Sequence, residues 1–141
     1  MDFVEELKSR ITGDPIKIVF PEGTEPRIVK AAARVAAEVI AVPILLGAKN
    51  AVMLAAEEAG ADISGIGIID PASSEKLEEY VAKYSEETRF PAPAARVLIK
   101  KPLGFGAAMT RFGDADAYVA GSVYRTSDVI QNCRQIIGME P

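Results

Sequence analysis

The chain has 141 residues, of which 49% are apolar and 26% charged, and its formal net charge is −4. This length and composition are typical of one folded domain with its own apolar core. The acidic balance argues against nucleic-acid binding, which requires many cations, but is compatible with a small anion held by a few local arginines. There is no histidine and one cysteine, Cys133, so an internal disulfide is excluded and no metal site is expected.

The amino-terminal residues lack the basic and apolar regions of a signal peptide. No apolar run approaches the ~20 residues that cross a bilayer. We therefore expect a cytoplasmic protein without a membrane partner.

Short apolar strands alternate with amphipathic helices along the chain. A first helix is expected from Asp2, with Phe3, Leu7 and Ile11 in one apolar stripe. Strands are predicted at 16–20, 42–46, 66–69 and 117–120. The next helices are predicted from a cap at Thr24, at 48–59, and from Ser73 or Ser74 to about Tyr84. Two helices are predicted between 94 and 112, with a break at 102–104. The last helix is predicted from Thr126 or Ser127 through Ile137.

Strands that are each followed by a helix form a parallel sheet with both faces covered. We therefore predict an α/β fold, a three-layer α/β/α sandwich of Rossmann-like type with a mostly parallel sheet. One domain is expected over residues 1–141. Gly104 and Gly106 do not form a dinucleotide fingerprint, because no strand precedes them and the third glycine is missing, so we interpret them as a structural bend.

The first candidate site follows the strand predicted at 16–20. Ligands of open parallel sheets bind beyond the carboxyl ends of strands. Arg27 falls in the first turn of the next helix, where a cation opposes the helix dipole, so it is a candidate for binding an anion. The alternative is a surface arginine paired with Glu22 or Glu25, which is a common arrangement.

The second candidate site follows the strand predicted at 117–120. A glycine turn lets the backbone approach a ligand closely, and free N–H groups at a helix start favour a phosphate. The residues predicted to bind a substrate here are Gly121, Ser122, Tyr124, Arg125, Thr126 and Ser127. The alternative is that Thr126, Ser127 and Asp128 only cap the helix.

Segments spread over nearly the whole chain resemble one known family. They are residues 16–23, 25–32, 43–47, 67–71 and 113–122. Each is weak alone, but the collinear set is similar to the phosphate acetyltransferase and phosphate butyryltransferase family. Residues 113–122, for example, are similar to that family's Gly-x-Ala-Asp-Gly-x-Val-Ser-Gly-Ala stretch.

The resemblance implies an enzyme that exchanges an acyl group between coenzyme A and inorganic phosphate. It implies two α/β domains with the site in the cleft between them, no metal, and no cofactor other than coenzyme A as a substrate. Acetyl-coenzyme A, coenzyme A and phosphate are then the expected partners, and Arg27 with the loop 121–128 faces the cleft.

This sequence also departs from the family pattern. Val123, Tyr124 and Arg125 stand where the family usually has Ala-His-Ser, and Gln131 with Asn132 replaces an Arg-Pro pair. The family's catalytic Ser-Arg pair and Asp lie near the carboxyl end of a chain more than twice this long, so no catalytic residue is assigned here.

We therefore expect an amino-terminal domain or fragment that lacks the second domain and the carboxyl-terminal segment, is inactive alone and forms a homo-oligomer. The alternatives are a non-catalytic regulatory module that binds coenzyme A or phosphate, a phosphate butyryltransferase, or a purely structural role in an assembly. The choice between acetyl and butyryl does not follow from these residues.

Overall fold

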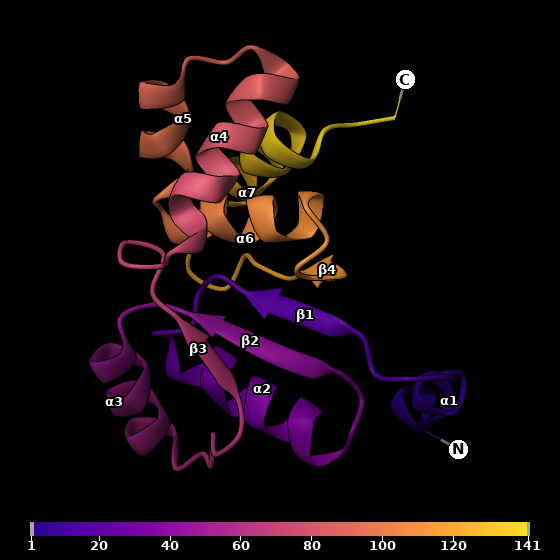
Figure 1. Cartoon of the computed structure of the whole chain (residues 1–141). Helices are drawn as coiled ribbons and strands as arrows, with labels where there is room; N and C mark the ends of the chain where they lie inside the picture. The colour runs from indigo at the N-terminus through magenta and orange to yellow at the C-terminus, as the bar shows by residue number, and fades with distance from the viewer. Residues whose placement is uncertain (1, 141) are drawn as a thin grey trace.

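A four-stranded sheet separates two groups of helices in the computed structural model, which describes residues 2–140 (Figure 1). Its strands are β1 Lys17–Phe20, β2 Val42–Leu46, β3 Gly67–Ile69 and β4 Ala117–Tyr118. All pairings are parallel and the order is β3-β2-β1-β4. The predicted parallel sheet is therefore confirmed, and only β4 is clearly shorter than expected.

The helices lie on both faces of this sheet, which confirms the predicted three layers (Figure 1). One face carries α2 Pro26–Ala37 and α3 Lys49–Ala59. The other carries α4 Lys76–Thr88, α5 Ala92–Ile99, α6 Pro102–Arg111 and α7 Thr126–Asn132, which continues as one turn of π-helix, η1 Cys133–Ile137. No helix within residues 2–140 combines the length and the apolar character that crossing a bilayer requires.

The central strands are apolar on both sides because each side meets a helical layer. Val19 and Leu46, both fully buried, belong to the core cluster shared with α4, α5 and α6. Phe20 and Leu45 belong to the cluster shared with α2 and α3. The alternation of side chains along a strand thus supplies two cores from one sheet.

The amino-terminal helix α1, Phe3–Ser9, is attached differently from the others. Its predicted apolar stripe is exposed, since Phe3, Leu7 and Ile11 are all open to solvent. An ion pair between Lys8 Nζ and Glu38 Oε2, at 2.6 Å, joins it to the end of α2.

Two predicted helix caps are wrong. Helix α2 begins at Pro26 with Glu25 in the N-cap position, and α7 begins at Thr126 with Arg125 there; neither cap makes a side-chain hydrogen bond. Proline already has a helical φ and lacks an N–H, so α2 has less need of the Thr24 hydroxyl. Thr126 and Ser127 lie inside the first turn of α7 and do not precede it.

The interpretation of Gly104 and Gly106 as a bend is also wrong, because both lie inside α6. A Cβ at Gly104 would lie 2.0 Å from the carbonyl oxygen of Leu98, and a Cβ at Gly106 would lie 2.9 Å from the Tyr118 ring. The glycines therefore let α6 pack closely against α5 and β4, and the chain breaks before Pro102.

We predict that Gly104→Ala lowers the free energy of unfolding by about 2 kcal/mol or more, because the added methyl group overlaps backbone atoms that cannot move independently. The better helix propensity of alanine, worth about 1 kcal/mol, offsets only part of this loss. Gly67→Ala is the control, since a Cβ there meets no atom within 4 Å, and it should change stability by less than about 1 kcal/mol. Urea unfolding measures both variants, and equal losses would contradict the packing argument.

Candidate ligand-binding crevice

The order of the strands places both predicted sites at one point of the sheet. From β1 the chain builds β2 and β3 on one side and returns to place β4 on the other. In open α/β sheets this reversal, between β1 and β4 here, opens a crevice beyond the carboxyl ends of the strands where ligands bind. The turn after β1 and the loop after β4 therefore meet at the expected position of a ligand.

The two segments are joined by the side chain of Glu22, which lies two residues after the end of β1 at Phe20. Its Oε1 accepts hydrogen bonds from the N–H groups of Gly121, at 2.7 Å, and Ser122, at 3.0 Å. Its Oε2 accepts from Val123 and, at 3.1 Å, from Tyr124. One carboxylate thus satisfies four successive backbone donors of the loop after β4.

Glu22 is charged although it is only 5% exposed, and within residues 2–140 it is the only charged side chain buried to this degree. Burial alone would raise the pKa of Glu22, but the four N–H donors, Val123 first among them, outweigh it and hold the pKa below the ordinary glutamate value. The carboxylate is therefore ionised at neutral pH and compensated by backbone dipoles.

A crevice of about 240 Å³ lies beside this carboxylate. Its walls are the residues Pro21, Glu22, Thr24, Glu25, Leu46, Gly47, Pro102, Val123 and Tyr124. Between the lining residues Glu22 and Thr24, the N–H of Gly23 donates to the Leu46 carbonyl at 3.1 Å, and a Cβ on Gly23 would lie 2.4 Å from that oxygen. Only glycine allows the turn after β1 to approach the end of β2 this closely.

Tyr124 gives the crevice a neutral polar group. Burial, and then the nearby Glu22 carboxylate, raise the pKa of its phenol. The hydroxyl is therefore protonated at neutral pH and is able to donate a hydrogen bond.

Arg27 lies at the start of α2, at the same carboxyl edge of the sheet as this crevice. Its Nε donates to Glu25 Oε1 at 2.8 Å, and its side chain is 74% exposed. This is the ion pair that the sequence offered as the alternative to a ligand role. Because the crevice walls hold two carboxylates and no cation, an anion would have to be bound from the outer side by Arg27 and Arg125.

The other predicted residues are not all in one place. The N–H groups of Gly121 and Ser122 are occupied by Glu22 and are not free for a phosphate. Arg125 and Thr126 are exposed next to Tyr124. Ser127 lines a different cavity, of about 610 Å³, along α7 and η1 with Gln131 and Arg134. The binding roles of these residues stay predictions.

The sequence did not indicate the role of Glu22. It suggested this residue only as a surface partner of Arg27, because its four hydrogen bonds reach residues 99 to 102 positions away. The available signal was an acidic residue between a strand end and a glycine, at the carboxyl edge of a predicted parallel sheet.

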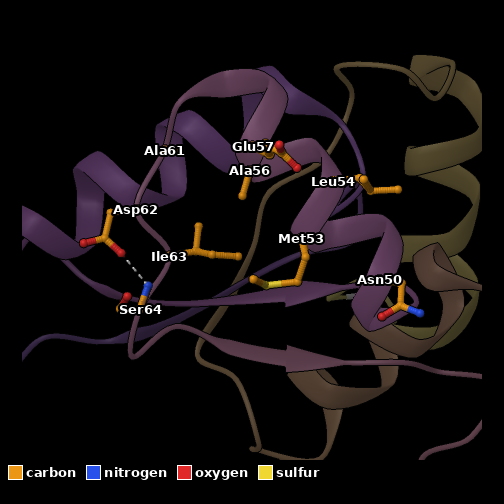
Figure 2. A pocket seen from close by; sticks show the side chains of 9 residues that line it. All are labelled: Asn50, Met53, Leu54, Ala56, Glu57, Ala61, Asp62, Ile63 and Ser64. Atoms are coloured by element: carbon orange, nitrogen blue, oxygen red, sulfur yellow. Dashed lines mark hydrogen bonds between the residues drawn. The ribbon is translucent and has the colours of Figure 1, made fainter.

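A larger cavity of about 660 Å³ lies on the flank of α3, where Met53, Leu54 and Ile63 supply its apolar wall (Figure 2). Its most prominent polar contact is internal, since the Asp62 carboxylate accepts the N–H of Ser64 at 2.9 Å. The polar groups there do not converge on a shared point, so this cavity is a weaker candidate than the crevice at Glu22.

The sequence profile described as phosphate acetyl/butaryl transferase matches residues 2–141, and the chain belongs to this family. It is 36% identical over 144 residues to a phosphate acetyltransferase of Thermoanaerobacterium thermosaccharolyticum, covering 100% of this chain and 43% of that protein. It is 34% identical over 142 residues to the phosphate acetyltransferase of Staphylococcus aureus, covering 99% of this chain and 43% of that protein.

Two solved structures are similar to the fold. A phosphotransacetylase from Streptococcus pyogenes aligns with a TM-score of 0.91 and 29% identity, over 100% of this chain and 44% of that one. The EutD phosphotransacetylase from Staphylococcus aureus aligns with a TM-score of 0.87 and 33% identity, over 98% of this chain and 42% of that one. The chain thus spans less than half the length of these relatives.

We predict that Glu22→Gln lowers the free energy of unfolding by roughly 2–3 kcal/mol near neutral pH, because hydrogen bonds to a charged acceptor are strong. Folding lowers the pKa of Glu22, so its contribution is complete above the ordinary glutamate pKa of about 4.3 and is lost as the pH falls through the folded-state value. The difference between wild type and variant should therefore shrink on acidification. Urea unfolding at several pH values measures it, and a difference that does not depend on pH would refute the assignment.

Proposed function

We propose that this chain is the amino-terminal part of a phosphate acyltransferase that moves an acyl group between coenzyme A and inorganic phosphate. The observation that carries the proposal is the alignment of the whole chain with phosphate acetyltransferases in sequence and in fold. In this role the chain supplies one wall of the active-site cleft, and the crevice between β1 and β4 lies in that wall. Acetyl-coenzyme A, coenzyme A and phosphate are the proposed partners, and no cofactor is required beyond them.

In this acyl transfer, the proposed contribution of the chain is to bind the substrates and to neutralise negative charge. A base removes the proton of the coenzyme A thiol, the thiolate attacks the carbonyl carbon of the acyl phosphate, and phosphate leaves with the electron pair of the broken C–O bond. Arg27 and Arg125 would neutralise the phosphate, while the Tyr124 hydroxyl would donate a hydrogen bond. None of the residues of this chain is assigned as the base.

A second candidate is a non-catalytic regulatory module that binds coenzyme A or phosphate. It is favoured by Tyr124 and Arg125, which stand where the family resemblance leads one to expect His and Ser, and by Gln131 in place of an arginine. A phosphate butyryltransferase is the third, because the family profile covers both acyl groups.

We also propose a cytoplasmic location and a homo-oligomer. The location rests on the proposed acyl transfer between coenzyme A and phosphate. The oligomer rests on exposed apolar side chains that a partner surface would cover, namely Val119 and Val123 after β4 and Ile130 on α7. Sedimentation equilibrium of the purified chain tests the proposed homo-oligomer, and a monomer would refute it.

We predict that Arg27→Ala weakens binding of coenzyme A or phosphate by about 1 kcal/mol, roughly five-fold, while the melting temperature changes by only a few degrees. The matched control is Arg34→Ala, since Arg34 is on the same helix, is 71% exposed and is likewise paired with a glutamate, Glu38. Isothermal titration calorimetry measures both. Equal effects of the two substitutions would show that Arg27 acts only through general charge.

We predict that the 141-residue chain alone does not reach the turnover of an ordinary enzyme, about 10 per second. Holding thiol and acyl phosphate together supplies ~7–11 kcal/mol of barrier reduction and requires both walls of the cleft, whereas this chain corresponds to 43% of its relatives. The assay is acetyl-coenzyme A formation from acetyl phosphate by chain of verified mass. A turnover at or above that level would mean that a complete site exists within the chain or across its oligomer.

A further inference from the structure

The loop at residues 121–124 has the form of an anion-binding site. Four consecutive N–H groups converge on one point, and such a concavity of backbone donors is called a nest. Gly121 begins it with a φ of 120°, which other residues rarely adopt. The loop therefore presents partial positive charge to whatever group fills it.

The nest lies at the reversal of strand order between β1 and β4. In nucleotide-binding α/β folds this is where a ligand's phosphate meets backbone N–H groups. Here the chain fills the position itself, with a carboxylate fixed by the fully buried Pro21 before it and by the tight packing of Gly23 after it.

Backbone N–H groups are the hydrogen-bond donors that compensate the charge of Glu22, and Arg27 interacts with it only at longer range. No Lys or Arg in the described part of the chain lies within ion-pair distance of its oxygens, and its two oxygens accept two N–H bonds each. Removal of the buried carboxylate would leave the four N–H groups without the acceptor that they share in the folded chain, and the loss of hydrogen bonds to a charged acceptor is costly.

We propose that Glu22 is a positioning residue, a built-in anion that occupies the nest of residues 121–124, excludes phosphate from it, and holds Tyr124 in the wall of the crevice. Phosphate bound at this crevice must then contact side chains such as Arg27 and Arg125 and not the nest. The statement about phosphate rests on the proposed function, whereas the dependence of the loop on Glu22 does not.

The test compares the wild-type chain with Glu22→Ala by amide hydrogen exchange, followed by NMR. In the variant, the N–H groups of residues 121–124 should exchange at least about ten-fold faster, while those of β1 and β2 report that the core is folded. Added sodium formate should slow them again by refilling the nest with a carboxylate, and should not change the wild type. Unchanged exchange in the variant, or no recovery in formate, would overturn the proposal.

Glu25→Ala is the matched control, because Glu25 lines the same crevice but bonds to Arg27 and not to the loop. It should leave the four amides as they are, and faster exchange there would overturn the specific role of Glu22. Inorganic phosphate is the second probe: it should protect the four amides in Glu22→Ala and not in wild type. If phosphate does not protect these amides in Glu22→Ala, the claim that Glu22 excludes phosphate is overturned. The formate result still tests separately whether the nest binds a carboxylate.

If Glu22→Ala does not fold, Glu22→Gln decides the question. A glutamine keeps one acceptor oxygen and turns an NH₂ group toward the other two donors, so two of the four amides should lose protection. Four unchanged amides would refute the proposal. Because none of these measurements uses coenzyme A or turnover, a failure of the proposed function would be seen separately.

Discussion

The site depends on one interaction, the acceptance of four successive backbone N–H groups by the buried Glu22 carboxylate. The strand β4 has only two residues, paired with Ile18 and Val19 of β1, and the Val119 N–H donates to the Val19 carbonyl just beyond it. This short ladder does not reach the loop that begins at Gly121. Glu22 supplies the missing attachment across 99 to 102 positions of sequence. Asp116 performs a similar task at the other end, accepting the N–H of Lys17 at 2.9 Å.

This attachment changes what the crevice is able to recognise. A Rossmann-like fold commonly offers free backbone donors to phosphate at the reversal of strand order. Here those donors are occupied, the walls contain two carboxylates, and the cations are exposed side chains outside the crevice. In the proposed function, recognition of an anion would therefore depend on the exposed side chains of Arg27 and Arg125 and on parts of the longer relatives, of which this chain spans about 43%.

Close backbone packing determines the shape of the crevice. Gly23 lets the turn after β1 touch Leu46, while Gly104 and Gly106 let α6 approach α5, Pro21 and Tyr118. These contacts hold the turn after β1 against β2, and α6 against α5 and the sheet. A methyl group at any of them would separate the elements that form the walls.

The sequence by itself determined the class of fold, because strand and helix periodicities are local properties. The four parallel strands were predicted to within about two residues, the usual uncertainty of element ends, whereas α4 continues to Thr88, past its predicted end near Tyr84. The sequence also placed the candidate site at the ends of β1 and β4. Tertiary structure alone decided which groups meet there. Glu22, and not a ligand, binds the loop; Arg27 pairs with Glu25; and Gly104 and Gly106 serve helix packing. Such partners are set by contacts between distant segments, and a pattern that reads only neighbouring residues does not contain them.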